Sequence, residues 1–454
     1  MGVAARVRSG RGAAGGQGPA GRGRARASAA VPAAAPPSGQ GLVTPRLATQ
    51  AGSVGPVRLQ QLVLIELAAA VVLVGWIVGP MLLAPAAVVA VGLLLLALVR
   101  RGRRPVAEWL FTAAALRRRA RRAAAEPVPP GTDPRFAPVA ECEPALRTGS
   151  FTDREQRQVG VVGDGTFLTA VLQVEAVDAP LRRHRTEKGL PLALLRDAME
   201  VDGILLESVQ VVQSALPAPA PHLPAQTLAA RNYAPLQERT GAPAARLTWV
   251  ALKFDPQLCP EAVTARGGGL EGAQRCLLRA GEQLASRLRG AGFSASLLSE
   301  DGLTAALATA ANVNPAATAQ AGQASRAGAP ARRTQETARA WRCDDRWHAT
   351  YWVGRWPQLG PGAASLPQLA ALLTSMPALS TTMSLTLGRG SVQGGRHAPT
   401  LAGHIRICGR SADELVTVGR ALERASRAVK AGLVRLDHEQ VPGVLATLPL
   451  GGTH

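Results

Sequence analysis

An acidic pair, Asp344-Asp345, precedes His348 in the stretch WRCDDRWHATYWVGRWP, residues 341–357. Neighbouring carboxylates near a histidine are residue types that bind a divalent metal or a nucleotide-sugar. The stretch is typical of a β-strand, however, and adjacent strand residues point to opposite faces. No second acidic cluster stands near it. A glycosyltransferase-like enzyme that uses these three residues is therefore the alternative hypothesis rather than the first.

The same stretch gathers five of the chain's fifteen aromatic residues. Two interpretations stay open. Trp, Tyr and Arg dominate binding hot spots, which favours an edge that docks a partner. Burial of a central strand beneath helices would use the same residue types. The candidate interface residues in this stretch are Trp347, Tyr351, Trp352 and Trp356.

Other motifs predict no catalytic chemistry. Arg266 and the three glycines after it lack the spacing and the lysine of a phosphate-binding P-loop, so a flexible turn is expected. No Ser/His/Asp order, H-E-x-x-H or G-x-S-x-G motif appears. Five cysteines, odd in number and without a C-x-x-C pair, indicate reduced thiols rather than disulfides or a zinc site. We predict a protein without catalytic residues, cofactor or metal.

The elements that must position these residues begin with an apolar stretch, Leu62 to Val99, whose one charge is Glu66. As a single helix it would be about 57 Å long, nearly twice the hydrocarbon core of a bilayer. Gly79-Pro80 breaks it, and Pro85 suits the first turn of a second helix. Residues 59–100 are therefore predicted to form a two-span transmembrane hairpin. Glu66 is a candidate partner-interface residue, unless its side chain simply reaches the membrane surface.

Charge on the two flanks of the hairpin predicts its orientation. Residues 1–58 carry eight Arg and no acid, and residues 100–122 carry nine Arg against Glu108. By the positive-inside rule both ends lie in the cytoplasm, which predicts a multi-pass plasma-membrane protein. The formal net charge of +20 lies mostly in these flanks, because residues 123–454 hold 34 basic and 29 acidic groups. This distribution favours anionic inner-leaflet lipid as a partner and argues against nucleic acid.

Composition divides the rest of the chain. Residues 1–58, rich in Ala, Gly and Arg, are expected to be a disordered basic tail. Residues 101–126 are expected to form a basic amphipathic helix on the inner leaflet, with Trp109 at the interface, or else a plain connection. In residues 127–454, strand and helix signals alternate, which predicts a cytosolic α/β domain with a mixed sheet and covering helices. Residues 312–338 are expected to be a low-complexity insertion.

The expected strands cover residues 158–162, 166–175, 204–213, 246–254, 294–299, 347–355, 381–388, 400–408 and 433–436. Helices are expected over residues 192–201, 271–289, 301–311, 366–375 and 411–431. A polar loop is expected between the strands 381–388 and 400–408, and a last short element over residues 441–448.

This layout resembles the EccE family, a core membrane component of the actinobacterial type VII (ESX) secretion system. The segments that carry the resemblance are RPVAEWL (104–110), VGVVGDGTFLTAVLQVE (159–175) and CDDRWHATYWVGRWP (343–357). In organisation it extends over roughly residues 58–450.

The resemblance implies a non-enzymatic structural subunit with its soluble domain in the cytosol. Its partners would be the other type VII membrane components, including the FtsK/SpoIIIE-like ATPase that drives export. The alternative remains a membrane-anchored glycosyltransferase-like enzyme at the inner leaflet, acting through Asp344, Asp345 and His348.

Overall fold

The computed structural model describes residues 46–47, 53–54, 57–98, 100–101, 104–126, 128–129, 131–153, 155–176, 189–216, 226–228, 231–232, 245–324, 332–358, 365–393 and 396–452. Almost all of the predicted tail, residues 1–58, lies outside this part of the chain. Residues 1–44 and 45–454 separate into two units, and every element below belongs to the second. The outcome for the tail is therefore not tested.

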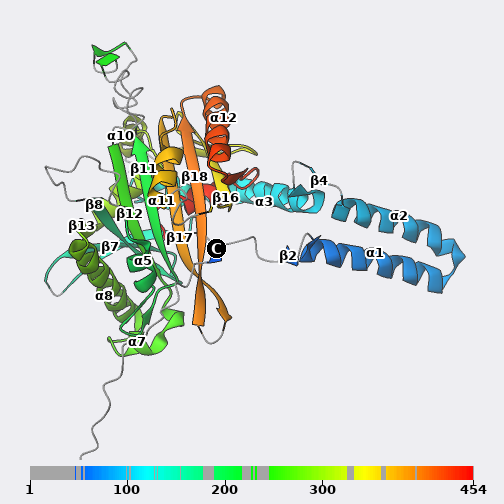
Figure 1. Ribbon diagram of the computed structural model, residues 1–454, viewed down its shortest axis with the longest axis horizontal. Coiled ribbons are helices and arrows are strands. Elements are labelled where there is room, and N and C mark those ends of the chain that lie inside the picture. Colours follow the sequence, from blue (N-terminus) through cyan, green and yellow to red (C-terminus); the bar gives the residue numbers. More distant parts are fainter. Residues whose placement is uncertain are drawn as a thin grey trace, which may run out of the picture. The chain divides into compact units, whose positions relative to one another are not determined.

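Two long helices, α1 (Leu59–Val78) and α2 (Pro80–Leu98), pack against each other as a hairpin (Figure 1). Gly79 joins them with a φ of +144°, a backbone conformation that side-chain-bearing residues rarely adopt. Pro80 begins α2, where its missing N–H costs no hydrogen bond. The expected place of Pro85 in the first turn of the second helix is therefore wrong, because α2 begins at Pro80 and Pro85 lies inside it.

Small residues line the contact between the two helices, where Ala68 and Ala90 are buried. Large apolar side chains face outward, with Trp76 74%, Ile77 72% and Met81 94% exposed. Within the described residues, no helix combines the length and the apolarity needed to cross a bilayer. The two predicted spans are thus not confirmed.

Helix α3 (Val106–Ala125) follows the hairpin and leads to a head built on one large sheet (Figure 1). Along its main path the strand order is β14-β15-β16-β18-β17-β11-β12-β8-β7-β6, with β13 beside β8 and β19 beside β16. These pairings are antiparallel, and β1 beside β18 is the parallel one among the described strands. The predicted α/β class is confirmed in its coarse form, as helices covering a large antiparallel sheet.

The bounds of the sheet strands are β6 Arg147–Thr152, β7 Gln158–Gly163, β8 Leu168–Ala176, β11 Ser208–Leu216, β12 Ala245–Phe254, β13 Phe293–Leu297, β14 Thr334–Glu336, β15 Trp341–Cys343, β16 Arg346–Arg355, β17 Ser380–Gln393, β18 Arg396–Gly409, β19 Gly432–Arg435 and β1 Arg46–Leu47. The remaining short strands are β2 Ser53–Val54, β3 Val57–Arg58, β4 Arg100–Arg101, β5 Arg104–Pro105, β9 Glu200–Val201 and β10 Ile204–Leu205.

The helices of the head are α4 Ala137–Cys142, α5 Leu192–Asp197, α7 Pro260–Thr264, α8 Gly269–Gly290, α9 Glu300–Ala310, α10 Pro315–Ala324, α11 Leu366–Thr374, α12 Ala412–Ala428 and α13 Gln440–Ala446, with a 3-10 turn, η2, at Pro256–Leu258. Helices α5, α8, α11 and α12 cover one face of the sheet. Helices α4, α9 and α13 cover the other face, together with the C-terminal residues Leu448 and Leu450. Both faces of the sheet are therefore buried.

The sheet consists of two halves with the same succession of elements. Apart from the short elements β9, β10, η2 and α7, the first half runs β6, β7, β8, α5, β11, β12, α8, β13, α9, and the second runs β14, β15, β16, α11, β17, β18, α12, β19, α13. Each half has the same internal strand order, and the halves meet where β11 pairs with β17. Ser208 and Ser380 occupy equivalent places in the two halves. Val212 lies four positions after Ser208, and Ser384 lies four positions after Ser380. Because Val212 and Ser384 pair with each other, they mark the centre of this join.

Three local expectations differ from the structure. The predicted polar loop between residues 388 and 400 is wrong, because β17 and β18 continue pairing as far as Gln393 opposite Arg396. Residues 312–338, expected as a low-complexity insertion, include α10 and β14. Residues 137–152 carry α4 and β6, which the hydrophobic pattern did not predict.

Candidate functional site: a polar seam around strand β14

Strand β14 has only three residues, yet polar contacts join it to several distant parts of the chain. We call the polar contacts of residues 332–336 the polar seam. Glu141, in α4, is 6% exposed, and its carboxylate accepts hydrogen bonds from Arg333 N at 2.9 Å and from Thr334 N at 2.7 Å. The Thr334 hydroxyl donates to the same carboxylate at 2.6 Å. A buried carboxylate is tolerated where several donors satisfy it, so Glu141 fixes the start of β14.

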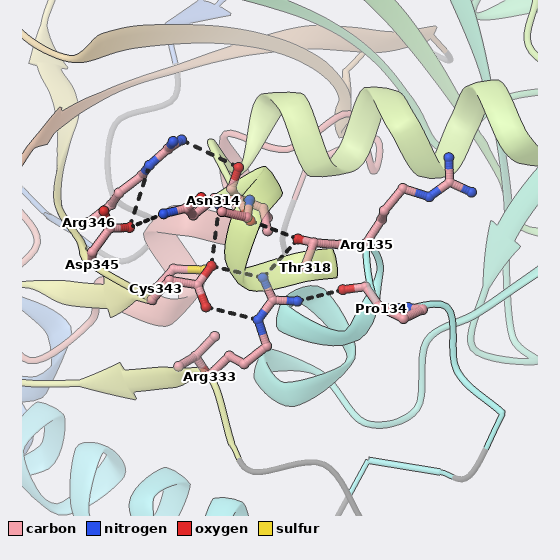
Figure 2. A network of polar contacts seen from close by, with 12 residues as sticks. Pro134, Arg135, Asn314, Thr318, Arg333, Cys343, Asp345 and Arg346 are labelled. Atoms are coloured by element: carbon pink, nitrogen blue, oxygen red, sulfur yellow. Dashed lines mark hydrogen bonds and ion pairs between the residues drawn. The ribbon is translucent and has the colours of Figure 1, made fainter. Parts of the chain in front are cut away.

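Arg333 and Asp344 form a buried ion pair at the centre of the seam. Figure 2 shows the Arg333 guanidinium within this network, between Pro134, Thr318 and Cys343. Arg333 Nε and Nη2 each donate to one Asp344 carboxylate oxygen at 2.8 Å, in the bidentate geometry that a guanidinium favours. Arg333 also donates to Pro134 O at 2.6 Å and to Thr318 Oγ1 at 2.9 Å. Burial alone would lower the pKa of Arg333, but the Asp344 carboxylate outweighs it and raises that pKa.

The two-residue turn Asp344-Asp345 connects β15 to β16 and holds the start of α10. Asp344 adopts a φ of +55°, a left-handed conformation that Asp tolerates better than most residues. Asn314 donates its backbone N–H to Asp344 Oδ2 at 3.3 Å and its side-chain amide to Asp345 Oδ1 at 2.9 Å (Figure 2). Arg346 donates to Asn312 O at 2.7 Å. The acidic pair thus organises a turn.

His348, the third member of the predicted catalytic set, does not meet the two aspartates. It is fully buried on the sheet face beneath α9 and α13, with its ring centroid 4.8 Å from that of Trp341. Burial lowers the pKa of His348 well below its usual range, and the charges of Arg406 and Arg346 lower it further. Asp344 is committed to Arg333, and the Asp345 side chain is 67% exposed. This geometry does not support the alternative of a glycosyltransferase-like site.

The arginine-rich helix α3 joins the seam through Arg119. Arg119 forms a bidentate ion pair with Glu336, at 2.9 and 3.0 Å, and donates to His438 O at 2.6 Å. Glu336 lies at the end of β14 and also accepts from Val441 N, at the start of α13, at 2.9 Å. One buried carboxylate therefore fastens α3 and α13 to the same short strand.

Two further contacts strengthen the attachment of α3. Arg332, next to β14, donates to Ala123 O of α3 at 2.7 Å and to Glu141 O at 2.9 Å. The Trp109 ring meets His438 edge-on at a centroid distance of 5.6 Å. Trp109, expected at the membrane interface, is half-buried and contacts the head in this structure.

The remaining candidate residues occupy different environments. Tyr351 and Trp356 are 3% and 8% exposed, whereas Trp347 and Trp352 are half-buried. Gly419 of α12 lies so close to the Tyr351 hydroxyl that a Cβ there would be 2.6 Å from it. Glu66 is exposed on α1. Whether these residues contact a partner stays a prediction.

The remaining motifs of the sequence are the glycine turn after Arg266 and the five cysteines, and neither forms a binding site in the described residues. Arg266 donates to Ala262 O at 3.0 Å and to Asp202 O at 3.2 Å, so its guanidinium folds back onto the protein beside the glycine turn. All five cysteines are free thiols. Within the described residues, no group of three or more His, Cys, Asp or Glu side chains is arranged to hold a metal ion.

The residues that build the seam were not individually predictable. Glu141 and Arg333 are 192 positions apart, and Arg119 and Glu336 are 217 apart. Strand β14 lies in a polar, Ala-rich segment without the period of two that marks a strand. The one available signal was the acidic pair Asp344-Asp345, which sequence reasoning assigned to possible chemistry rather than to a turn.

Comparison with protein families identifies part of the chain. Residues 242–353 match the family model described as "Putative type VII ESX secretion system translocon, EccE". No curated protein matches the chain. The matched segment runs from just before β12 into β16 and includes Arg333 and the Asp344-Asp345 turn.

This match confirms the expected family. A type VII secretion translocon family implies association with a membrane and with other components of the secretion system.

Proposed function

We propose that the chain is a non-enzymatic structural subunit of a type VII protein secretion complex, anchored in the plasma membrane by the hairpin α1–α2. The observation that carries this proposal is the polar seam. It fixes α3, the helix that follows the hairpin, to the head through Arg119, Glu336 and Arg332. A subunit that must hold a folded head at a membrane requires such an attachment.

The hairpin supplies the second argument. Its outward side chains, among them Trp76, Ile77 and Val88, are 72–74% exposed. Soluble surfaces rarely carry a contiguous apolar patch of this kind, which marks a membrane or protein contact. We propose that the hairpin inserts into the bilayer with both chain ends in the cytoplasm, because arginines dominate both flanks.

The arginines of α3 divide into two groups. Arg119 turns toward the head, whereas Arg117, Arg118, Arg121 and Arg122 are exposed. Exposed arginines close to a bilayer are attracted to anionic lipid, at about 1 kcal/mol each. We propose that α3 contacts inner-leaflet lipid with these four residues while Arg119 holds the head.

We propose that the partners are the other membrane components of the type VII complex, including the FtsK/SpoIIIE-like ATPase. The candidate contacts are Glu66 on the hairpin and the half-buried Trp109, Trp347 and Trp352. An ATPase partner would supply energy, since the sequence carries no P-loop.

Purification of the tagged full-length chain from membranes in mild detergent tests this function. The other type VII membrane components are expected to co-purify with it. Arg119→Gln should weaken their recovery, because it detaches α3 from Glu336. Arg420→Gln, which changes an exposed arginine of α12, is the matched control and should leave recovery unchanged.

An enzyme predicts a different pattern. If secretion fails when Asp345 is replaced by Asn although the chain is stable and its partners co-purify, chemistry at the acidic pair accounts for the function instead. If the wild-type chain carries none of the other components, the proposed assembly is wrong.

A further inference from the structure

The two halves of the sheet carry different buried polar residues at equivalent positions. In the first half Thr169 pairs across the strands with Lys253, and Lys253 with Ser208. In the second half His348 pairs with Cys408, and Cys408 with Ser380. Thr169, Lys253 and Ser208 therefore correspond to His348, Cys408 and Ser380.

In the first half, the chain itself satisfies this polar set. The C-terminal segment crosses the sheet and accepts hydrogen bonds from Thr169 at 3.1 Å, through Leu450 O, and from Ser208 at 2.5 Å, through Gly451 O. Lys253 Nζ lies 3.2 Å from Glu207 Oε1. Each buried polar group in this set has a protein partner.

In the second half, the corresponding face carries a buried cation without a carboxylate. Arg406, 2% exposed, stands where the first half has Ala251. Its Nη2 donates to Ala310 O at the C-terminal end of α9, but its Nη1 has no acceptor among the residues that the structure describes. Burial lowers the pKa of Arg406 to about 10, and within the described residues no Asp or Glu side chain forms an ion pair with it. A backbone carbonyl carries only a partial charge, so the guanidinium is not neutralised.

Two further donors lie beside Arg406 on the same face. Thr350, fully buried, is directly opposite Arg406 on β16, and its hydroxyl has no partner in the described part of the chain. His348 precedes Thr350 by two positions and therefore points to the same face. The Nδ1 atom of His348 also lacks a partner within the described ranges.

We assign the proton of neutral His348 to Nδ1 from the contact of Nε2 with Cys408. Burial raises the pKa of the Cys408 thiol to about 11, so the thiol is protonated at neutral pH. Its sulfur lies 3.7 Å from His348 Nε2 and accepts from Asn312 Nδ2 at 3.1 Å. With the thiol donating to Nε2 of a neutral ring, Nδ1 carries the hydrogen and is a donor.

We propose that this part of the second half binds a small monovalent anion, such as chloride, held by Arg406 Nη1, Thr350 Oγ1 and His348 Nδ1. A buried cation and two hydrogen-bond donors without acceptors are the complement of an anion. The site admits only a small ion, because α13 packs directly over it. A Cβ on Gly443 would lie 2.8 Å from Thr350 Cβ.

Thermal unfolding of the purified full-length chain in detergent tests the proposal. Chloride is titrated against gluconate at constant ionic strength, so that only the anion changes. The unfolding temperature should rise with chloride and saturate as for a single site. A wild-type chain whose unfolding temperature is the same in both salts contradicts the proposal.

Substitutions locate the effect. Thr350→Val removes one hydroxyl with little change in volume and should weaken the apparent chloride affinity about tenfold, as expected for one hydrogen bond to a charged group. Arg406→Met should abolish the response, whereas Arg420→Met, which removes an exposed arginine of α12, should retain it. If Arg406→Met does not fold, Thr350→Val alone decides, and a wild-type response in that variant overturns the site.

Diffraction from crystals soaked in bromide gives a second test. An anomalous peak within about 3.5 Å of Arg406 Nη1 is expected, since bromide replaces chloride with similar hydrogen-bond distances. A structure that shows only water at the three donors contradicts the assignment.

Discussion

The two halves of the head share one topology but use their buried polar residues for different ends. In the first half, the turn between β7 and β8 at Asp164-Gly165 is a local device, with Asp164 accepting from Thr166 within two residues. In the second half, the equivalent turn at Asp344-Asp345 bonds to Arg333 and Asn314. The fold supplies the same frame twice, and the second copy carries the attachment to α3.

The comparison also holds beneath the covering helices. The first half closes its polar set with its own chain. In the second half Asn312 donates to the equivalent Cys408 and Ser380, but one polar atom each of Arg406, Thr350 and His348 has no partner among the described residues. Shared topology therefore does not imply shared function. The differences lie in a few side chains at equivalent positions, and each can be tested by paired substitutions.

The largest expected effect is at the two turns. Asp344→Asn should destabilise the protein by about 3 kcal/mol, because it leaves the buried Arg333 without a charged partner. Asp164→Asn, at the equivalent exposed turn, should cost less than about 1 kcal/mol. Chemical denaturation of both variants measures the difference. Equal losses would show that the second turn is no more than a local device.

The two buried cations should respond in opposite directions. Lys253→Met is expected to cost about 2 kcal/mol, because Glu207 loses its partner. In gluconate, Arg406→Met should be neutral or stabilising, since it removes a buried charge that no carboxylate balances. Denaturation of both variants in chloride-free buffer tests this contrast, which fails if Arg406→Met is the more damaging.

The pH dependence should come from the second half. Burial lowers the pKa of His404 to about 4, and the equivalent residue of the first half is Trp249. In the unfolded chain the pKa of this histidine is about 6.5, so between about pH 6.5 and about pH 4 the unfolded state binds a proton that the folded state does not. The free energy of unfolding therefore falls as the pH falls through this range. For His404, the loss from pH 7 to pH 5 is about 2 kcal/mol.

His404→Gln should remove this part of the slope in denaturation experiments at several pH values. A variant that retains the full wild-type slope would place the titration elsewhere.

The smallest effect separates two buried threonines. Thr169→Val should cost about 1 kcal/mol, because it breaks the hydrogen bond to Leu450 O. Thr350→Val in gluconate should change stability by less, since its hydroxyl has no protein partner to lose. Matched unfolding curves in gluconate compare them, and a larger loss at Thr350 would mean that a hydrogen bond exists there without the anion.

Much of the frame was predictable from local patterns. Strands β7, β8, β12 and β16 and helices α8 and α12 lie close to their predicted bounds, because alternation and helical spacing are strong there. The equivalence of the two halves was not predictable, because the segments VVGDGTFLTAV and WRCDDRWHATY share little beyond an acidic turn. Antiparallel pairing of β11 with β17 is a long-range choice that no local period reveals.

The seam shows the same limit at the level of single residues. Asp344 was singled out for its type, but its role depends on Arg333, which no motif marks. Glu141 and Glu336 resemble ordinary surface acids in the sequence, and only tertiary packing buries them. Whether a charged side chain is buried depends on partners far away along the chain. Residue type alone therefore suggested a catalytic role for Asp344, whereas in the structure Asp344 forms a structural ion pair.

The central claim is that this chain works as part of a membrane assembly. Size-exclusion chromatography of detergent-solubilised membranes, with the chain and the ATPase each detected by antibody, tests it most directly. The account predicts that both elute together, at a mass far above the 47.0 kDa of the chain. Elution of the chain by itself, at the size of one copy in its detergent micelle and apart from the ATPase, would contradict it.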